Sequence, residues 1–385
     1  MNATQESLLV DGFNPRDPGV AMLARAINPA EPALLVHCGP LPGAGRNATR
    51  LVLDVRERPE NGERCIPAQL PVDLRAASAS SETGVDPELP LGQRWPLALV
   101  WPRAHLGKDF SEQCLALAAM HLQPGGRLLC AVRKARGGAS LKRSMAALLG
   151  NVRVVSRDRG YHLHVSENVA GVDLQLARAA CERRYAWSDP LLDGLELLGV
   201  PGVFSRKHLD HGTAALLRHL AEIWTDTDAP TPTRVLDIGC GVGPLSIWAA
   251  RRWPSASVLA VETNALAAAL ARLNATRAGL SERVQVLHRD ILTMVPPANP
   301  DELPPGFRGA SCELAVVNPP THAPSEIFAR LVTAPSHFLR PGAPAWFVVN
   351  RSGSLRKALS RSGAIVDAPV EVPGFHLVRA RWPSD

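Results

Sequence analysis

The hydrophobic pattern of the chain alternates between short apolar runs and longer amphipathic stretches. In the first half, apolar runs at 33–38 (ALLVHC), 50–55 (RLVLDV), 96–101 (PLALVW) and 127–132 (RLLCAV) predict strands. Between two of these runs, residues 111–122 place apolar side chains at the spacing of one helix face. Strands that alternate with helices indicate a parallel α/β sheet.

The second half of the chain repeats this alternation. Apolar runs predict strands at 234–238, 258–261, 284–287, 314–317 and 345–349. In each half a strand ends in a short proline element, Trp101-Pro102-Arg103 in one and Asn318-Pro319-Pro320 in the other. Each half then continues with a Pro-Gly pair and another apolar strand. We therefore predict a duplicated α/β fold, with domains at 1–190 and 191–385.

Two stretches interrupt the apolar pattern. Residues 76–92 and 225–233 are rich in proline, serine and threonine, and neither has apolar periodicity. Both are predicted to be loops.

Composition limits the classes of protein that fit. The chain has 385 residues, of which 46% are hydrophobic and 20% charged, as in globular proteins of two or three domains. No apolar run approaches the roughly 20 residues that span a bilayer, and the N-terminal residues do not resemble a signal peptide. We therefore expect a cytoplasmic protein with no membrane contact. The seven scattered cysteines predict neither disulfides nor a metal site, and the net charge of +6 is compatible with an RNA partner.

A glycine loop provides the first candidate site. The predicted strand 234–238 carries Asp237 and runs into Gly239, Gly241 and Gly243, and a helix follows. Glycines at such a turn let a ligand approach the backbone and the helix N-terminus. Glu262, after the next strand, is placed to accept hydrogen bonds from the hydroxyls of an adenosine ribose. The D-x-G-x-G pattern favours S-adenosylmethionine over a dinucleotide.

Two further strand ends carry candidate residues. Asp290 follows the third predicted strand, where it would accept from an adenine amino group or cap a helix. Asn318, Pro319 and Pro320 follow the fourth. The Asn318 side-chain oxygen and the Pro319 carbonyl are each able to accept one N–H of a neutral amine, which directs the nitrogen lone pair toward a methyl donor. The pattern thus predicts an amine methyltransferase, in which Asn318 lies close to both cofactor and substrate.

At this point the chain resembles the ribosomal RNA small-subunit methyltransferase C family, whose members make N2-methylguanine. The likeness rests on PGVFSRKHLDHGT (201–213), VLDIGCGVGPLS (235–246), NPPTH (318–322) and GFHLVRA (374–380). It implies two tandem Rossmann-like methyltransferase folds, of which the first is degenerate and serves RNA positioning or stability. It also implies S-adenosylmethionine as cofactor and ribosomal RNA or a ribosomal subunit as partner.

One position departs from the family pattern. Thr321 stands where the family has a phenylalanine that would stack on the target base. Either another aromatic side chain takes this role, with Phe204, Phe307 and Phe328 as candidates, or the substrate differs, or activity is reduced. His322 is a candidate for contact with a base or phosphate, and Arg206 for contact with phosphate.

Other interpretations stay open from sequence alone. A cluster of basic residues, Arg133, Lys134, Arg136, Lys142 and Arg143, is either an RNA-docking patch or a solvated loop. The methyl acceptor is either a guanine amine or another amine, on a protein glutamine or a small molecule. A third alternative is an RNA-binding module that has lost catalysis.

Overall fold

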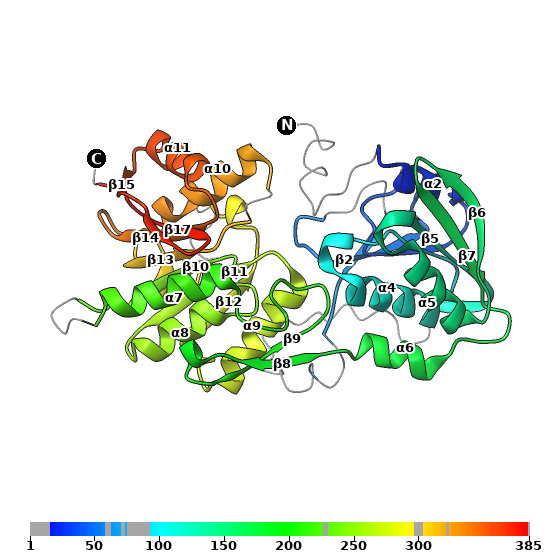
Figure 1. Ribbon diagram of the computed structural model, residues 1–385, viewed down its shortest axis with the longest axis horizontal. Coiled ribbons are helices and arrows are strands. Elements are labelled where there is room, and N and C mark those ends of the chain that lie inside the picture. The colour runs from blue at the N-terminus through cyan, green and yellow to red at the C-terminus, as the bar shows by residue number, and fades with distance from the viewer. Residues whose placement is uncertain are drawn as a thin grey trace. The chain divides into compact units, whose positions relative to one another are not determined.

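The computed structural model describes residues 16–57, 63–70, 74, 93–225, 230–295, 303–320 and 323–383. The chain forms two compact units (Figure 1). The first unit consists of Met1–Arg184 with Val200–Gly202, and the second unit of Tyr185–Gly199 with Val203–Asp385. Each unit is built around one large sheet.

The sheet of the second unit has the strand order β12-β11-β10-β13-β14-β17-β15. The strands from β12 to β14 pair in parallel, and β17 runs antiparallel to β14 and β15. The strands are β10 (Arg234–Ile238), β11 (Ser257–Glu262), β12 (Val284–His288), β13 (Leu314–Val317), β14 (Pro344–Val349), β15 (Ile365–Val366), β16 (Val370–Val372) and β17 (Phe375–Arg381). A separate pair of strands, β8 (Tyr185–Ser188) and β9 (Glu196–Gly199), precedes them.

Helices cover both faces of this sheet. Figure 1 shows α7, α8 and α9 on one face and α10 and α11 on the other. Their bounds are α7 (His211–Ile223), α8 (Pro244–Arg252), α9 (Ala265–Arg277), α10 (Ser325–Thr333) and α11 (Gly353–Arg361). Helix α8 begins at Pro244, where the missing N–H costs no hydrogen bond, and the side chains of Asp210 and Asn264 cap α7 and α9. These caps fix the start of each helix at the carboxyl edge of the sheet.

The sheet of the first unit has the order β3-β2-β1-β4-β5-β7-β6. Its strands from β3 to β5 are parallel and β7 is antiparallel to β5. The elements are β1 (Ala33–Val36), β2 (Ala48–Val52), β3 (Arg64–Pro67), β4 (Trp95–Val100), β5 (Leu122–Arg133), β6 (Arg153–Asp158), β7 (Tyr161–Glu167), α2 (Pro18–Ala26), α4 (Lys108–Met120), α5 (Ala139–Leu149) and α6 (Leu174–Cys181). The two sheets share one topology, so the predicted tandem of Rossmann-like folds is confirmed.

The five strands predicted in the second unit agree with the structure to within one residue at each end, including β12 at the edge of its sheet. β10 and β13 have the predicted bounds. The apolar pattern missed β3, β6 and β7, and β6 is an edge strand with no fully buried residue. Residues 76–92 lie outside the described part of the chain, as do 226–229 of the other predicted loop.

No helix among the described residues has the length and apolar character needed to cross a membrane. Within the same residues, no group of three or more histidine, cysteine or acidic side chains is arranged to hold a metal ion.

Candidate active site

The glycine loop joins β10 to α8 through three residues with positive φ. Gly239, Gly241 and Gly243 have φ of 72°, 58° and 92°, which only glycine adopts without strain. A Cβ atom at Gly239 or Gly241 would meet nothing within 4 Å, whereas one at Gly243 would contact Ala271 at 3.5 Å. The first two glycines therefore border open space into which a ligand fits, and the third lets α9 pack against the loop.

Asp237 lies beneath this loop in a fully buried position. Its Oδ2 accepts a 2.6 Å hydrogen bond from the Ser246 hydroxyl, while its buried Oδ1 has no hydrogen-bond partner among the described residues. Burial, and to a lesser extent the nearby Glu262 carboxylate, raises the pKa of Asp237 to about 7, although the Ser246 hydrogen bond opposes this shift. A buried acceptor without a partner is the arrangement expected for a site that receives a cationic ligand.

Glu262, the last residue of β11, is tied to the same loop. Its Oε2 accepts from the Gly241 N–H at 2.9 Å, and its Oε1 accepts from the Thr263 and Asn264 N–H groups at 2.8 Å each. These bonds fix the carboxylate beside the open space at Gly239 and Gly241. Contact of this carboxylate with a ribose remains a prediction.

Asp290 follows β12 by two residues at the same edge of the sheet. Its Oδ1 accepts from the Leu292 N–H at 3.0 Å and caps the short helix η5 (Ile291–Thr293). The capping role that the sequence left open is therefore present in the structure. Contact with adenine remains a prediction.

Two side chains hold Asn318 in one orientation: Asp210 at the N-cap of α7 and Thr213 within α7. Its Nδ2 donates to Asp210 Oδ2 at 2.8 Å and to Thr213 Oγ1 at 3.0 Å. Both amide hydrogens are thus engaged, and Oδ1 is the end of the amide left to accept from a substrate. Pro319 is buried next to it and Pro320 is exposed, so the proline pair joins the sheet edge to the surface.

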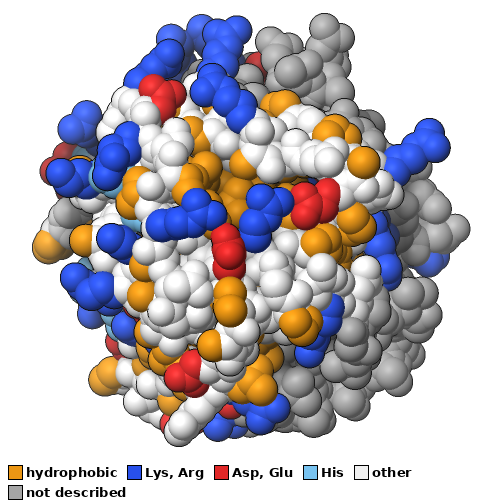
Figure 2. Space-filling view, turned by 90° about the vertical axis from the view of Figure 1, so that its right-hand side faces the viewer, with side chains coloured by type: hydrophobic (Ala, Val, Ile, Leu, Met, Phe, Trp, Pro, Cys, Tyr) orange, Lys and Arg blue, Asp and Glu red, His pale blue; other side chains and the backbone are white. Residues whose placement is uncertain are grey.

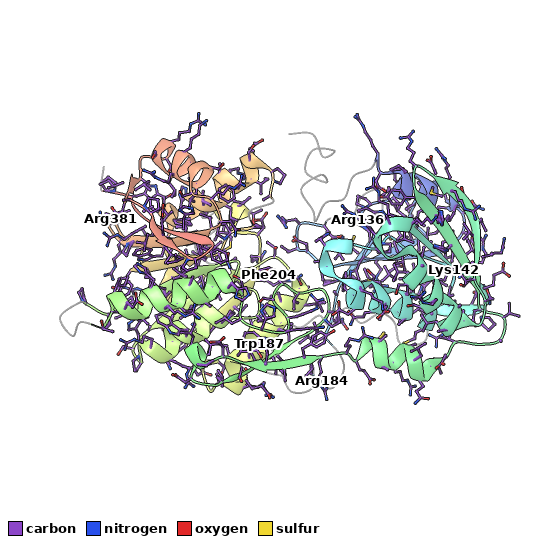
Figure 3. All side chains as sticks on the ribbon, in the orientation of Figure 1. Arg136, Lys142, Arg184, Trp187, Phe204 and Arg381 are labelled. Carbon is purple, nitrogen blue, oxygen red and sulfur yellow. The ribbon has the colours of Figure 1, made fainter. Side chains whose placement is uncertain are left out.

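A small cleft of about 50 Å³ lies between the glycine loop and Asn318, and Asp237, Glu262, Asp290 and Pro319 are not among its lining residues. The lining residues come from the glycine loop, the N-terminus of α7, the segment before it, β8 and the end of β13: Trp187, Phe204, Ser205, His208, Leu209, Asp210, Thr213, Gly239, Cys240, Gly241, Val242, Pro244, Leu245 and Asn318. Figure 3 labels Trp187 and Phe204, which lie in the second unit. The cleft thus unites three of the sequence motifs, at 201–213, 235–246 and 318.

The structure distinguishes the three phenylalanines proposed in place of the family aromatic. Phe204 is 68% exposed and lines the cleft. Phe307 and Phe328 are buried in the hydrophobic core of the second unit, so neither is positioned to stack on a base. Arg206 is half-buried and is not among the residues that line the cleft. Thr321 and His322 lie outside the described residues.

Three site residues were not assigned roles from the sequence. Asp210 and Thr213 orient Asn318, and Ser246 bonds Asp237. The D-x-x-T spacing of a helix N-cap was present before an amphipathic helix and would have marked Asp210. Nothing local in the sequence pairs this cap with Asn318, because 108 residues separate them.

The first unit carries different residues at the corresponding edge. The parallel registers of β1 with β4 and of β10 with β13 align the two units, and Leu35 then occupies the position of Asp237. The registers of β1 with β2 and of β10 with β11 place Val52 at the position of Glu262. Trp101 follows β4 where Asn318 follows β13. Asp237, Glu262 and Asn318 are therefore each replaced in the first unit, whereas Gly39 and Pro102 keep the residue types of Gly241 and Pro319.

One backbone hydrogen bond supports this alignment. His37 N–H donates to Leu51 O at 3.1 Å, and Gly239 N–H donates to Val261 O at 2.8 Å in the second unit. His37 also keeps a positive φ of 50° at the position of Gly239. The turn survives in the first unit without its glycine.

A buried ion-pair network lies beside this turn. Arg103 donates to His37 O at 3.0 Å and to Glu57 Oε1 at 3.1 Å. Arg50 contacts Glu57 at 3.4 Å and Glu63 at 2.8 Å, and these four charged side chains are almost completely buried. Charged groups that neutralise one another thus stand where the second unit has an open glycine loop.

Comparisons with known proteins agree with this geometry. The model of the family described as "Methyltransferase small domain" matches residues 194–379. A ribosomal RNA small subunit methyltransferase C of Pseudomonas paraeruginosa is 29% identical over 77% of this chain and 82% of its own length. That of Pseudomonas entomophila is 30% identical over 69% of this chain and 74% of its own length. A 16S rRNA N2 methyltransferase of T. thermophilus, solved with AdoMet and guanosine, is 23% identical with a TM-score of 0.73, over 95% of this chain and 92% of that one.

The solved structure confirms the fold of both units, because it covers nearly the whole chain. The relatives confirm the predicted class of enzyme, a methyltransferase that depends on S-adenosylmethionine. The chain belongs to the ribosomal RNA small subunit methyltransferase C family.

Proposed function

We propose that this protein transfers a methyl group from S-adenosylmethionine to the exocyclic N2 amine of a guanine in ribosomal RNA of the small subunit. The environment of Asn318 supports the proposal: the residue lines the cleft that the glycine loop borders, and both of its amide hydrogens are already engaged, which leaves Oδ1 to accept from a substrate. The family relatives are named as ribosomal RNA small subunit methyltransferases, and the similar T. thermophilus protein is a 16S rRNA N2 methyltransferase, which supports the substrate class. Such a substrate also implies the cytoplasmic location expected from the sequence.

The residues of the second unit fit the cofactor in three places. Gly239 and Gly241 leave open space for it, and the Asp237 Oδ1 without a partner suits its positively charged amino acid end. Glu262 is placed to accept from the ribose hydroxyls once its loop contacts adjust, and Asp290 to accept from the adenine amino group. When bound, S-adenosylmethionine supplies a methyl group on a positively charged sulfur.

The residues around Asn318 orient the acceptor amine. Asn318 Oδ1 and the Pro319 carbonyl each accept one N–H of the guanine N2 amine, which leaves the nitrogen lone pair directed toward the methyl group. Asp210 and Thr213 keep the amide from turning its nitrogen toward the substrate. The proton released after transfer passes to water, so no residue of the cleft has to act as a strong base.

Phe204 is the side chain that we assign to stacking on the target base. It is the exposed aromatic residue of the cleft, and stacking on a base that has left its helix contributes about 1–3 kcal/mol. Phe204 would thus take the role of the phenylalanine that the family has at the position of Thr321. Contacts of Arg206 and His322 with phosphate or base belong to the same proposal.

The test is transfer of radiolabelled methyl to a panel of acceptors: undermethylated small subunits, their naked RNA, total protein and small amines. The account expects label in RNA, recovered as N2-methylguanosine, and loss of about 100-fold or more in kcat for Asn318→Ala. Asn350→Ala is the matched control, because Asn350 follows β14 at the same sheet edge but does not line the cleft.

Each acceptor class gives a distinct result. Label in protein or in small amines instead of RNA would replace the guanine assignment by another amine. If the protein binds both the cofactor and RNA but transfers no methyl group, the result would favour an RNA-binding module that has lost catalysis.

A further inference from the structure

The first unit contains a pocket that the proposed reaction does not use. Its volume is about 800 Å³, within the range of about 300–1,000 Å³ typical of ligand sites. It opens at the carboxyl ends of β4 and β5, and its walls include Trp101, Pro102, Arg133, Arg136 and Tyr161. We call it the first-unit pocket.

The first-unit pocket lies at the sheet position that corresponds to Asn318 and Pro319 of the second unit, where we place the substrate. Trp101 and Pro102 follow β4 as Asn318 and Pro319 follow β13, and Arg133 ends β5. Arg103, which also lines the pocket, bonds to His37 O and Glu57 beside the turn that corresponds to the glycine loop. The duplication has therefore kept a substrate-side cavity and lost the groups that hold a methyl donor.

The chemistry of the pocket combines cations with aromatic faces. Arg133 stacks over the Tyr161 ring with 5.4 Å between its guanidinium carbon and the ring centre. Arg136 is exposed, and no carboxylate among the described residues pairs with it. Arg136, labelled in Figure 3, lies in the irregular turn η3 (Lys134–Gly138) after β5, where its φ of −121° and ψ of 57° leave the helical region.

The acidic side chain in the pocket wall is already engaged. Asp17 accepts from the Tyr161 hydroxyl and from the Gly19 N–H at 2.8 Å. Lys108 adds a further cation at the wall, although it is paired with Glu112 at 3.3 Å. The pocket is thus net positive, and Figure 2 shows a face of the same unit on which lysine and arginine side chains prevail over acidic ones.

We propose that the first-unit pocket binds one unpaired nucleotide of the RNA substrate. Arg133 and Arg136 hold its phosphate, and Trp101 and Tyr161 border the base. A phosphate next to an aromatic wall is the combination by which proteins hold single-stranded nucleic acid without reading its sequence. The proposal rests on the function proposed above, since the ligand is the same RNA, and it assigns the first unit an RNA-holding role.

The test uses the full chain and the variant Arg136→Glu. The expected result is that KM for small-subunit RNA rises about tenfold, kcat changes less than twofold, and the dependence of log affinity on log salt becomes shallower by about 1. Affinity for S-adenosylmethionine and transfer to free guanosine remain at wild-type values. Arg178→Glu is the control, because Arg178 is equally exposed on α6 and does not line the pocket.

Direct binding separates this proposal from the proposed function. Fluorescence anisotropy of a labelled single-stranded fragment of small-subunit RNA is measured for wild type and both variants, with poly-glutamate peptide as competitor. Binding weakened by Arg136→Glu but not by Arg178→Glu supports the pocket even if no methyl transfer is seen. Equal RNA affinity for the two variants, or displacement by poly-glutamate at the same charge concentration as RNA, overturns it and leaves the methyltransferase assignment standing.

Discussion

The two units of this protein share one sheet topology but fill its carboxyl edge in opposite ways. The second unit leaves the edge open, with Gly239 and Gly241 beside free space and the Asp237 Oδ1 without a partner. The first unit fills the side of the edge beside the His37 turn with buried arginine–glutamate pairs, and its pocket lies at the ends of β4 and β5. One copy thus keeps a buried acid with an unpaired oxygen, whereas the other pairs its buried glutamates with arginines. The comparison shows that a fold retains its shape after its ligand chemistry has been exchanged for structural ion pairs.

The largest effect is expected from breaking the internal pairs of the first unit. Arg50→Met leaves Glu63 buried without its arginine, and Glu57 without one of its two. Removing one partner of a buried pair costs about 3–5 kcal/mol, so the free energy of unfolding of the first unit should fall by that amount. Urea unfolding followed by hydrogen exchange in β1 and β2 measures it. A loss below about 1 kcal/mol would show that these pairs do not support the first unit.

The next prediction concerns Glu262, the proposed ribose-binding acid. It is replaced by the residue type found at the corresponding position of the first unit. Glu262→Val copies Val52 and removes a carboxylate that would bond the ribose hydroxyls. Charged hydrogen bonds contribute about 1.5–3 kcal/mol, so the dissociation constant of S-adenosylmethionine should rise about 100-fold in calorimetry. Glu262→Gln is the control for the Gly241 contact, since it keeps the shape and one acceptor. A Kd within threefold of wild type for Glu262→Val would remove Glu262 from the cofactor site.

The pH dependence of cofactor affinity tests the buried acid. Burial raises the pKa of Asp237 to about 7, so the carboxyl is mostly neutral below that pH and ionised above it. A cationic ligand requires the ionised form, and affinity should therefore increase about tenfold from about pH 6 to about pH 8. Asp237→Asn should bind more weakly and with a flat profile. An unchanged pH profile in this variant would assign the titration to another group.

The smallest effect concerns the orientation of Asn318. Thr213→Val keeps the shape of the side chain but removes Oγ1, one of the two acceptors of the Asn318 amide. Loss of one neutral hydrogen bond corresponds to about 1 kcal/mol, so kcat should fall about fivefold with little change in KM. Steady-state kinetics with RNA measures both constants. A rise in KM with unchanged kcat would make Thr213 a binding residue instead of a positioning residue.

The sequence predicted the parts of this comparison that depend on local patterns. The apolar runs of β10 and β13 and the glycine loop between β10 and α8 were found because buried parallel strands and tight turns leave clear signals. The degenerate first unit was predicted from the resemblance to the family. Edge strand β6 was missed because its residues are largely exposed.

The remaining features depend on contacts between distant parts of the chain. The contact of Asn318 with Asp210 and the bond between Arg103 and Glu57 each join residues far apart in sequence. A sequence pattern indicates the core by its apolar residues. A buried charged residue such as Arg103 therefore gives no signal of its burial. Phe204 was one of three candidates, and only burial separated it from Phe307 and Phe328.

The most direct test of the division between the units is the stoichiometry of S-adenosylmethionine binding to the full chain by isothermal titration calorimetry. We expect one site per chain, a dissociation constant raised about 100-fold by Glu262→Val, and no effect of the first-unit variant Arg103→Met. Two sites per chain, or a single site weakened by Arg103→Met but not by Glu262→Val, would contradict it.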